Sequence, residues 1–195
     1  RYNIRLAARK GVTVHWSRSE EDLKKFFDLY EITAVRDKIG HRPYEYFKRM
    51  VDAYGSSDLL RIYIAEHEGE PLSGAICIHY GNKTWYIYGA SSNNKRNLMP
   101  NYAMQAEMIR WGFENGSKIY DFGGVFILDK TNGLYKFKEG FCRREGATEF
   151  IGEFDLVYNP LLYTSFAKVL PMVQRRRNRK HQQESVQPAP KQEKE

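Results

Sequence analysis

Apolar and polar residues alternate along the chain with two different periods. Residues 12–16, "VTVHW", have a period of two, which is typical of a strand. Residues 17–37 repeat apolar side chains every three or four positions, as a helix does, and Ser17 precedes Glu20 at the spacing of a capping box. The apolar positions of this helix are Leu23, Phe26, Phe27, Tyr30 and Ala34. The pattern predicts a strand followed by a helix that Ser17 caps.

The next segment, residues 43–91, is predicted to form a helix and three strands. Pro43 suits a first helical position, and Gly55 marks the end of that helix. Residues 59–67, 72–80 and 84–91 then have strand-like composition and are separated only by the short turns "EGEP" and "GNK". Such short connections predict an antiparallel meander.

Helical and strand patterns alternate in the rest of the chain. A helix starts at Pro100 with Tyr102, Ala106, Ile109 and Phe113 on one face, which we expect to be its core face. A strand in "SKIYDFGG" (117–124), a helix over 131–141, a strand over 148–158 and a helix from Pro160 follow. An antiparallel meander ahead of α/β units predicts an α+β domain with a mixed sheet and helices packed on it. The same order of elements is found in the N-acyltransferase fold of Gcn5-related enzymes (GNAT).

Composition and charge divide the chain into three parts. Hydrophobic residues make up 42% and aromatic residues 14%, which excludes a wholly disordered protein. Residues 11–173 are predicted to form one domain. Residues 1–10 form a basic amphipathic pattern that we expect to be the final helix of a preceding domain. Residues 174–195 carry seven Lys or Arg against three Glu without an apolar period, and they predict a disordered basic tail.

The sequence of the basic tail does not identify its partner. The chain has a formal net charge of +7, and the tail holds much of it. RNA or an anionic membrane surface would attract such a segment, but charge runs alone are unspecific, so a solubilising tail is an equal alternative.

Cysteine and histidine spacing predicts no metal site. Cys77 lies in an apolar strand pattern, Cys142 is far from it in sequence, and the five His have no metal-ligand spacing. Neither a signal peptide nor an apolar stretch long enough to cross a bilayer is found in the sequence. We therefore expect a cytoplasmic location.

Two short stretches are candidates for chemistry. In "LYKFKEGFC" (134–142), Lys136 points away from the apolar face of the helix, whereas Lys138 falls on its flank. A lysine there either extends its ammonium group to solvent or meets an anionic partner. "DFGG" (121–124) lacks the companion motifs of a kinase and is interpreted as a strand end where glycines permit a close turn.

The junction before the helix at Pro100 argues against coenzyme A. Enzymes of the GNAT fold that use acetyl-CoA hold its pyrophosphate on a glycine-rich loop at this point. Here the junction reads "SSNNKRNLMP", with no glycine between Ser91 and Pro100. We therefore expect no acetyl-CoA.

Several blocks in order resemble the Fem family of aminoacyl-tRNA-dependent transferases, which build peptidoglycan cross-bridges. They are "RYNIRLAARKGV", "DLYEITAVRD", "YGA" followed by "PNYAMQAEMIRWGFENG", "YDFGGV", "GLYKFKEGF" and "FIGEFDLVYNPLLY". The resemblance covers residues 1 to about 166. It implies two tandem acyltransferase-like domains, of which this chain would be the second. The helical arm of some members is not seen, which favours the branch that adds Ala, Ser or Gly.

The resemblance also implies substrates. The donor would be aminoacyl-tRNA, acting as co-substrate without a further cofactor, and the acceptor a stem-peptide amine of UDP-MurNAc-pentapeptide or lipid II. The protein would be cytoplasmic, with a position at the inner membrane face left open. Aminoacyl transfer to another amine, and a non-catalytic RNA- or membrane-binding module, stay as alternatives.

Residue roles follow from the same resemblance. Phe137 and Lys138 match a family pair in the tRNA acceptor channel, where an ammonium would stabilise the oxyanion or anchor a phosphate and a ring would support a base or ribose. Arg36 resembles an arginine that meets the diphosphate of the precursor; its alternative is an ion pair with Asp37.

Other residues join the candidate site with open alternatives. Arg42 and Tyr46 are close enough in sequence to join Arg36 at the acceptor. Tyr88 and Tyr102 flank the junction and would hold the acceptor peptide, or they are buried structural tyrosines. The sequence presents no general base, and none is assigned.

Overall fold

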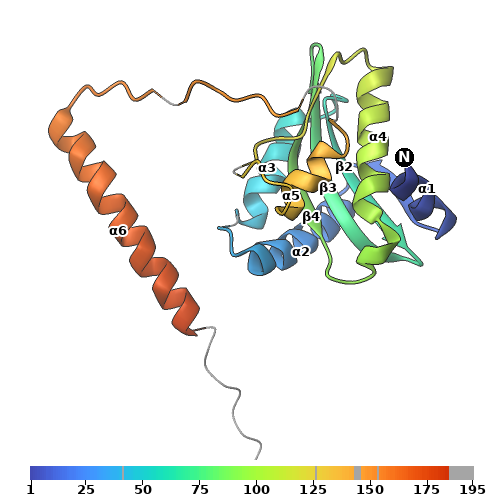
Figure 1. Ribbon diagram of the computed structural model, residues 1–195, viewed down its shortest axis with the longest axis horizontal. Coiled ribbons are helices and arrows are strands. Elements are labelled where there is room, and N and C mark those ends of the chain that lie inside the picture. The colour runs from blue at the N-terminus through green and yellow to red at the C-terminus, as the bar shows by residue number, and fades with distance from the viewer. Residues whose placement is uncertain (41, 126, 143–145, 153, 185–195) are drawn as a thin grey trace, which may run out of the picture. The chain divides into compact units, whose positions relative to one another are not determined.

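The structure, a computed structural model, describes residues 1–40, 42–125, 127–142, 146–152 and 154–184, with side chains up to residue 173 (Figure 1). The strands are β1 (Thr13–Ser17), β2 (Leu60–His67), β3 (Glu70–Tyr80), β4 (Lys83–Ser91) and β5 (Ile119–Asp121). The helices are α1 (Tyr2–Arg9), α2 (Glu20–Asp37), α3 (Tyr44–Tyr54), the 3-10 helix η1 (Arg96–Leu98), α4 (Pro100–Glu114), α5 (Gly133–Glu139) and α6 (Pro160–Glu184). The chain forms two compact units, Arg1–Ala147 and Thr148–Glu195, which are described separately.

The first unit is built on a five-stranded sheet of order β1-β2-β3-β4-β5. The first four strands pair antiparallel in sequence order, and β5 runs parallel to β4. The predicted meander and mixed α+β sheet are therefore confirmed. Only Lys83–Trp85 of β4 pair with β5, so the second half of β4, from Tyr86 on, has no strand beside it on that edge in the described part of the chain.

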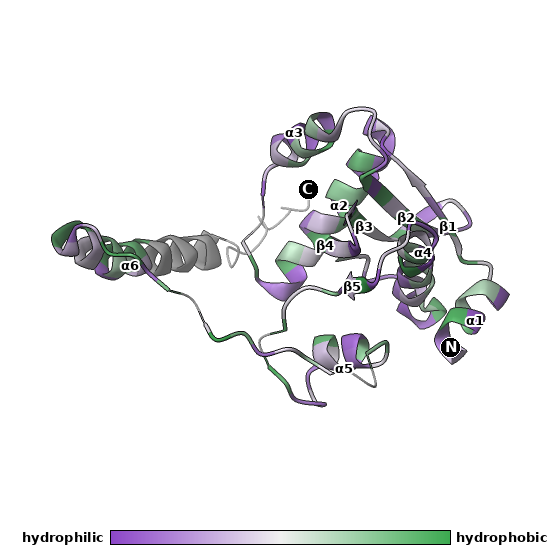
Figure 2. Cartoon of the chain, turned by 90° about the horizontal axis from the view of Figure 1, so that it is seen from above, coloured by the Kyte–Doolittle hydropathy of each residue, from purple (hydrophilic) through white to green (hydrophobic). Residues whose placement is uncertain are grey.

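Helices cover both faces of this sheet (Figure 1). On one face, α2 and α3 pack over Leu60, Ile62 and Ile64 of β2; on the other, α1 and α4 pack over the intervening Tyr63 and Ala65. The alternation follows from the two-residue period of a strand with both faces buried. Figure 2 shows the apolar colour of the strands between the two helical layers.

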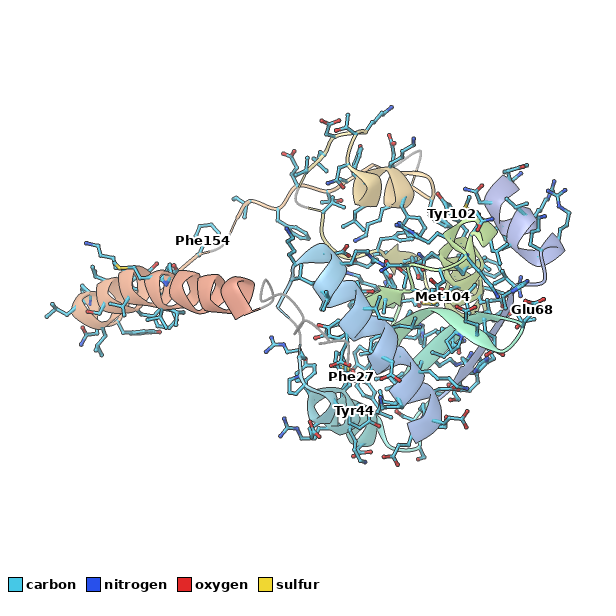
Figure 3. The ribbon with its side chains drawn as sticks, turned by 90° about the horizontal axis from the view of Figure 1, so that it is seen from below. Phe27, Tyr44, Glu68, Tyr102, Met104 and Phe154 are labelled. Atoms are coloured by element: carbon cyan, nitrogen blue, oxygen red, sulfur yellow. The ribbon has the colours of Figure 1, made fainter. Side chains whose placement is uncertain are left out.

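Aromatic rings hold α2 and α3 together and to the sheet. Phe27 of α2 meets Tyr44 of α3 with ring centroids 5.4 Å apart, and Figure 3 shows the two side by side. Beneath them Phe47 meets Phe26 and Tyr30 edge to face at 5.3 and 5.0 Å, and Phe26 stacks on Tyr30 at 5.8 Å. Truncating a fully buried ring such as Phe47 costs about 3–5 kcal/mol, so this layer is a major source of stability.

A bulge interrupts β4. Ile76 of β3 pairs with Tyr88, but the next residue, Cys77, pairs with Tyr86, so Ile87 is the extra residue. The bulge changes the alternation of side chains. As a result Tyr86 packs in the layer of α1 and α4, whereas Tyr88 packs in the layer of α2 and α3.

Two details of the helices correct the sequence-based expectations. Ser19, not Ser17, is the N-cap of α2, and its side chain accepts from Asp22 N–H. The core face of α4 is formed by Met104, Met108 and Trp111, and Phe113 of the expected face is 81% exposed. Both apolar stripes have helical spacing, and packing against the sheet selects the second.

The termini also differ from expectation. Helix α1, residues 2–9, packs on α4 with Ala7 fully buried, so the segment expected to be the final helix of a preceding domain also contributes to the core of this unit. The strand predicted over 148–158 is wrong: its described residues, 148–152 and 154–158, form no strand. Helix α6 continues through 174–184, which composition had placed in the tail; residues 185–195 lie outside the described range.

In the second unit, the described side chains of α6 leave a wide apolar surface exposed, including Leu161, Leu162, Phe166 and Val169. Pro171 lies within this helix. None of the helices in the described ranges is both long and apolar enough to cross a membrane.

Candidate functional site

Helix α5 is short and is held in place by aromatic contacts. Asn132 caps it by accepting the backbone N–H groups of Leu134 and Tyr135. Phe137 meets Tyr102 of α4 at 5.0 Å, edge to face, and Phe141, just after α5, stacks on the same ring at 5.6 Å. Leu134, at the start of the same helix, is half exposed.

These contacts bring together two residues predicted for the site, Phe137 and Tyr102. Figure 3 shows Tyr102 on α4, two positions before the core residue Met104. Phe122, directly after β5, adds a third element to the aromatic cluster through its ring contact with Phe141 at 5.2 Å. The helix that carries Lys138 is therefore anchored on both α4 and the end of β5.

Lys138 turns back toward the chain that follows β5. Its Nζ donates to the carbonyl oxygens of Gly123 at 3.3 Å and Gly124 at 2.9 Å. Burial lowers the pKa of Lys138, and the Asp121 carboxylate and Cys142 oppose part of that shift. The ammonium is thus half-buried and fixed by two carbonyls, and it does not extend to solvent from the edge of the helix.

Asp121 lies at the base of this arrangement. One carboxylate oxygen pairs with Lys83 of β4 at 2.7 Å, and the other accepts the Gly123 N–H at 2.8 Å. Burial alone would raise the pKa of Asp121, but Lys83, the Gly123 N–H and the charge of Lys138 outweigh it and lower the pKa. The group is therefore an anion between two lysines.

A second group of predicted residues gathers where α3 faces β4. The Arg42 guanidinium carbon lies 5.2 Å from the centre of the Tyr46 ring, and the Tyr88 hydroxyl donates to the Tyr46 hydroxyl at 3.1 Å. Burial, with the hydrogen bond to Tyr46, raises the pKa of Tyr88 to about 12, so it is a neutral donor near pH 7. The Arg42 cation and the Tyr46 hydroxyl therefore offer donors to an anionic oxygen, while the hydrogen of Tyr88 is engaged with Tyr46.

Arg36 is occupied within the chain. Its guanidinium donates to both carboxylate oxygens of Asp37 at 2.9 and 3.2 Å and to the Ser91 carbonyl at 2.8 Å. Further bonds go to the Asn93 side chain at 3.1 Å and the Ser91 hydroxyl at 3.3 Å. An arginine has five N–H donors, so these contacts use the whole fork. The ion pair with Asp37, the alternative considered from the sequence, is present.

The junction between β4 and α4 does not fit a coenzyme A pyrophosphate. Lys95 pairs with Glu68 at 3.4 Å and Glu70 at 3.0 Å, and Asn94 also donates to Glu70. Asn94 and Lys95 lower the pKa of Glu70, so Lys95 is paired with ionised Glu70 and is not free for a phosphate. A pyrophosphate would meet these carboxylates in place of a row of backbone N–H groups.

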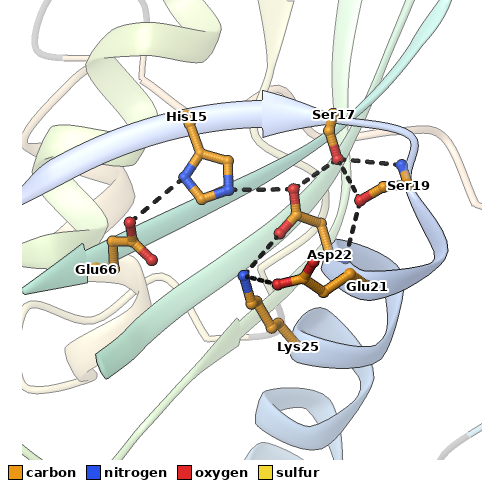
Figure 4. Close-up of polar contacts among 7 residues, drawn as sticks. All are labelled: His15, Ser17, Ser19, Glu21, Asp22, Lys25 and Glu66. Carbon is orange, nitrogen blue, oxygen red and sulfur yellow. Dashed lines mark hydrogen bonds and ion pairs between the residues drawn. The ribbon is translucent and has the colours of Figure 1, made fainter. Parts of the chain in front are cut away.

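A polar cluster that the sequence did not reveal lies at the start of α2 (Figure 4). Asp22 is almost fully buried and accepts from Ser17 at 2.5 Å, His15 Nε2 at 3.1 Å and Lys25 at 3.3 Å. Ser17 and His15 both bond to the carboxylate and not to each other, so the set is not a nucleophilic triad. It joins β1 to α2.

The described residues contain no group of three or more His, Cys, Asp or Glu side chains that could hold a metal ion. The predicted residues instead form two groups, one around Lys138, Phe137 and Tyr102 and one of Arg42, Tyr46 and Tyr88. Asp121, Gly123 and Phe141 join the first group without having been predicted. The "DFGG" motif was the signal for Asp121 and Gly123, although its glycines were interpreted only as a turn.

Comparison with known proteins shows what the chain is similar to. The FemAB family model matches residues 1–68 and 60–170. A UDP-N-acetylmuramoylpentapeptide-lysine N(6)-alanyltransferase of Weissella viridescens is 40% identical over 165 residues, which cover 85% of this chain and 48% of the relative. A lipid II:glycine glycyltransferase of Staphylococcus aureus (strain USA300) is 30% identical over 241 residues, covering 88% of this chain and 56% of the relative. The chain thus spans about half the length of these relatives.

Solved structures agree on the fold. The crystal structure of FemX superposes with a TM-score of 0.68 at 27% identity, covering 84% of this chain and 57% of that one. An aminoglycoside N-acetyltransferase in complex with CoA gives a TM-score of 0.57 at 14% identity, covering 75% of this chain and 95% of that one. The second likeness concerns fold alone and establishes the GNAT-like architecture. Together with the match over residues 1–170, these similarities place the chain in the FemAB family.

Proposed function

We propose that the protein transfers an amino acid from aminoacyl-tRNA to a stem-peptide amine of a peptidoglycan precursor, building the interpeptide bridge of the cell wall. The amine attacks the carbonyl carbon of the tRNA ester, a tetrahedral oxyanion forms, and the 3' oxygen of the tRNA leaves as a hydroxyl that takes up the proton lost by the amine. The enzyme has to hold both substrates and stabilise the oxyanion. No residue is assigned as general base.

The ammonium of Lys138 is the observation that carries this proposal. It is half-buried, and two carbonyls fix its position. An ammonium has three N–H donors, and the bonds to Gly123 and Gly124 use two of them. The third is available to the ester oxyanion or to a phosphate of the tRNA end. The Phe137 ring beside it supports a terminal base or ribose.

The group formed by Arg42, Tyr46 and Tyr88 suits the acceptor. Tyr88 donates to Tyr46, which leaves the Tyr46 hydroxyl hydrogen for an oxygen of the substrate, and Arg42 adds a positive charge. A sugar-linked diphosphate, as in UDP-MurNAc-pentapeptide or lipid II, presents such oxygens. Arg36, whose donors are engaged, supports the end of β4 and reaches the diphosphate only by releasing Asp37.

The donor amino acid is proposed to be Ala, Ser or Gly, in line with the alanyl- and glycyltransferase relatives. The alignment to the glycyltransferase is longer than this chain, so that relative carries residues without counterparts here. We propose that the chain acts as the second of two tandem domains, in the cytoplasm, without acetyl-CoA or another cofactor.

The test uses the gene-length protein, charged tRNA carrying labelled Ala, Ser or Gly, and each precursor in turn. Lys138→Met should reduce transfer by about 100-fold or more, the scale of losing an oxyanion donor. Lys136→Met is the matched control, because Lys136 lies two positions away on the same helix and is exposed. Equal transfer by both variants would remove Lys138 from the site. Absence of transfer by the unaltered protein to either precursor would shift the proposal to another amine acceptor.

A second candidate function is binding to an anionic membrane surface or RNA through the end of the chain. The exposed apolar residues of α6 are followed by the basic sequence "RRRNRK" from Arg175, a composition that favours anionic surfaces. Deleting residues 174–195 separates the functions: a transferase keeps its turnover, whereas a tail-driven binder no longer sediments with anionic vesicles or RNA. Contact with the inner membrane face would also bring a transferase close to lipid II.

A further inference from the structure

The chain turns sharply between β5 and the loop that leads to α5. Asp121 is the last residue of β5, and its carboxylate accepts the Gly123 N–H at 2.8 Å. Gly123 has φ +70°, a left-handed conformation that side chains other than glycine rarely adopt. Because of this turn, the carbonyls of Gly123 and Gly124 both meet Lys138 Nζ.

The carboxylate of Asp121 is itself fixed on both oxygens. The residue pairs with Trp85 in the parallel ladder, which sets its backbone, and the ion pair with Lys83 at 2.7 Å holds the second oxygen. Its side chain therefore links the edge of the sheet to the turn. Neither the ion pair nor the turn involves an atom of α5, so this support exists independently of the helix that carries Lys138.

The ammonium of Lys138 depends on that support in two ways. The carbonyl oxygens that it contacts stay in position only while the turn keeps its shape. The charge of Asp121 also favours the protonated form of the lysine, against burial. On these contacts we propose that Asp121 is a positioning residue: through the Gly123–Gly124 turn it holds the Lys138 ammonium at the acyl-transfer site. Its effect on catalysis rests on the proposed function; its effect on Lys138 does not.

Loss of this support is expected to change kcat more than KM. An oxyanion donor that moves by a few tenths of an ångström loses much of its effect on the transition state but little of substrate binding. Asp121→Ala removes both the Gly123 contact and the charge, and should lower kcat by about tenfold or more with KM for either substrate little changed. Asp121→Asn keeps an oxygen that can accept the Gly123 N–H, so its kcat should fall less.

The dependence of activity on pH provides a second test of the role of Asp121. Activity that needs protonated Lys138 is lost as pH rises through the lysine pKa. Asp121 and Cys142 are the groups that face this ammonium, and on α5 Glu139 is paired with Lys130 at 3.6 Å. Because Asp121 raises the pKa of Lys138, either substitution should move the alkaline limb of the profile to lower pH.

Asp129→Asn is the matched control. Asp129 lies in the same loop, and its carboxylate accepts the Thr131 N–H at 2.9 Å, also two residues ahead. It makes no bond to Lys138 among the described residues. Its substitution tests whether any loss of an aspartate turn contact in this loop has the same effect.

A direct readout of Lys138 separates this inference from the proposed function. The gene-length protein is prepared with 13C-labelled lysine, the Lys138 signal is assigned from Lys138→Arg, and its titration is followed by NMR in each variant. A lower Lys138 pKa in Asp121→Asn and Asp121→Ala, with Asp129→Asn unchanged, supports the positioning role. That result in a protein without transfer activity would keep the positioning role and reject the proposed function. An active protein whose kcat and Lys138 titration are the same in all three variants would overturn the inference.

Discussion

Arg36 and Arg42 were both candidates for the diphosphate of the acceptor, and the structure predicts opposite results for their substitution. All the donors of Arg36 are bound within the chain, whereas Arg42 is exposed and has a cation–π contact to Tyr46 at 5.2 Å. Arg36→Gln should therefore lower mainly the stability of the protein. Arg42→Gln should lower mainly the affinity for the precursor.

The contacts of each arginine set the expected changes in unfolding free energy and in affinity. The pair of Arg36 with Asp37, whose side chain is 48% exposed, contributes at most about 1 kcal/mol after solvent screening, and the bond to the Ser91 carbonyl about 1 kcal/mol. Arg36→Gln should thus cost about 1–2 kcal/mol of unfolding free energy. Arg42→Gln should cost less than about 1 kcal/mol of stability, since it loses a single exposed cation–π contact. A charged hydrogen bond to phosphate is worth about 1.5–3 kcal/mol, a 10- to 150-fold rise in Kd.

The assay combines urea unfolding of both variants with calorimetric titration of UDP-MurNAc-pentapeptide into the gene-length protein. The reasoning would be refuted if Arg36→Gln weakened binding by more than Arg42→Gln at unchanged stability. Arg42→Lys serves as the control for charge: it keeps the cation and loses the planar fork, so its affinity should lie between those of the unaltered protein and Arg42→Gln.

Three further predictions concern stability and order. Gly89→Ala would place a Cβ 1.6 Å from the Tyr86 hydroxyl and should cost about 1–3 kcal/mol; an unchanged thermal midpoint would contradict the packing. Burial alone would raise the pKa of Asp22, but its hydrogen bonds outweigh burial and lower it, so its stabilisation is present above the unfolded pKa of about 3.9 and disappears as pH falls through the folded value. Asp22→Asn should flatten urea-derived stability against pH in that acid range. Phe141→Ala removes the stacking on Tyr102 and should raise amide hydrogen exchange in α5 by about tenfold, with other helices unaffected.

The sequence predicted the elements well where the Pro and Gly residues that begin or end an element agreed with its apolar period. Pro43 and Gly55 flank α3 as expected, and the short turns of the meander set the antiparallel order. Helix α4 shows where prediction of the core face from the apolar period fails. Its sequence contains two apolar stripes, and only contact with β2 and β3 decides that Met104 and Met108 are buried in place of Phe113.

The incorrect strand at 148–158 has a related cause. Its residues include β-formers such as Phe150 and Ile151, yet both side chains are about nine-tenths exposed in the structure. Strand propensity reflects packing and ladder pairing with neighbours more than an intrinsic preference of the backbone. A sequence pattern cannot supply the neighbouring strand.

The site was predicted in outline only. Sequence identified Lys138 as unusual because a helix places it beside an apolar face, and the structure gives it two carbonyl partners. Those partners come from the turn after β5, more than ten residues earlier, and no periodicity links the two segments. The choice between a phosphate and Asp37 for Arg36 was likewise open, because both explanations use the same residue types.

The extra residue in β4 decides on which face of the sheet each of the two tyrosines of that strand lies. In a regular strand Tyr86 and Tyr88, two positions apart, would face the same side, and Tyr46 would lose its hydroxyl partner; the bulge at Ile87 puts them on opposite sides. A substitution that let Ile87 pair regularly with β3 would therefore separate Tyr88 from Tyr46 while leaving Lys138 in place, whereas deletion of Ile87 would keep both tyrosine pairings. In comparisons among relatives, a one-residue gap at Ile87 is thus compatible with the same arrangement of the two tyrosines.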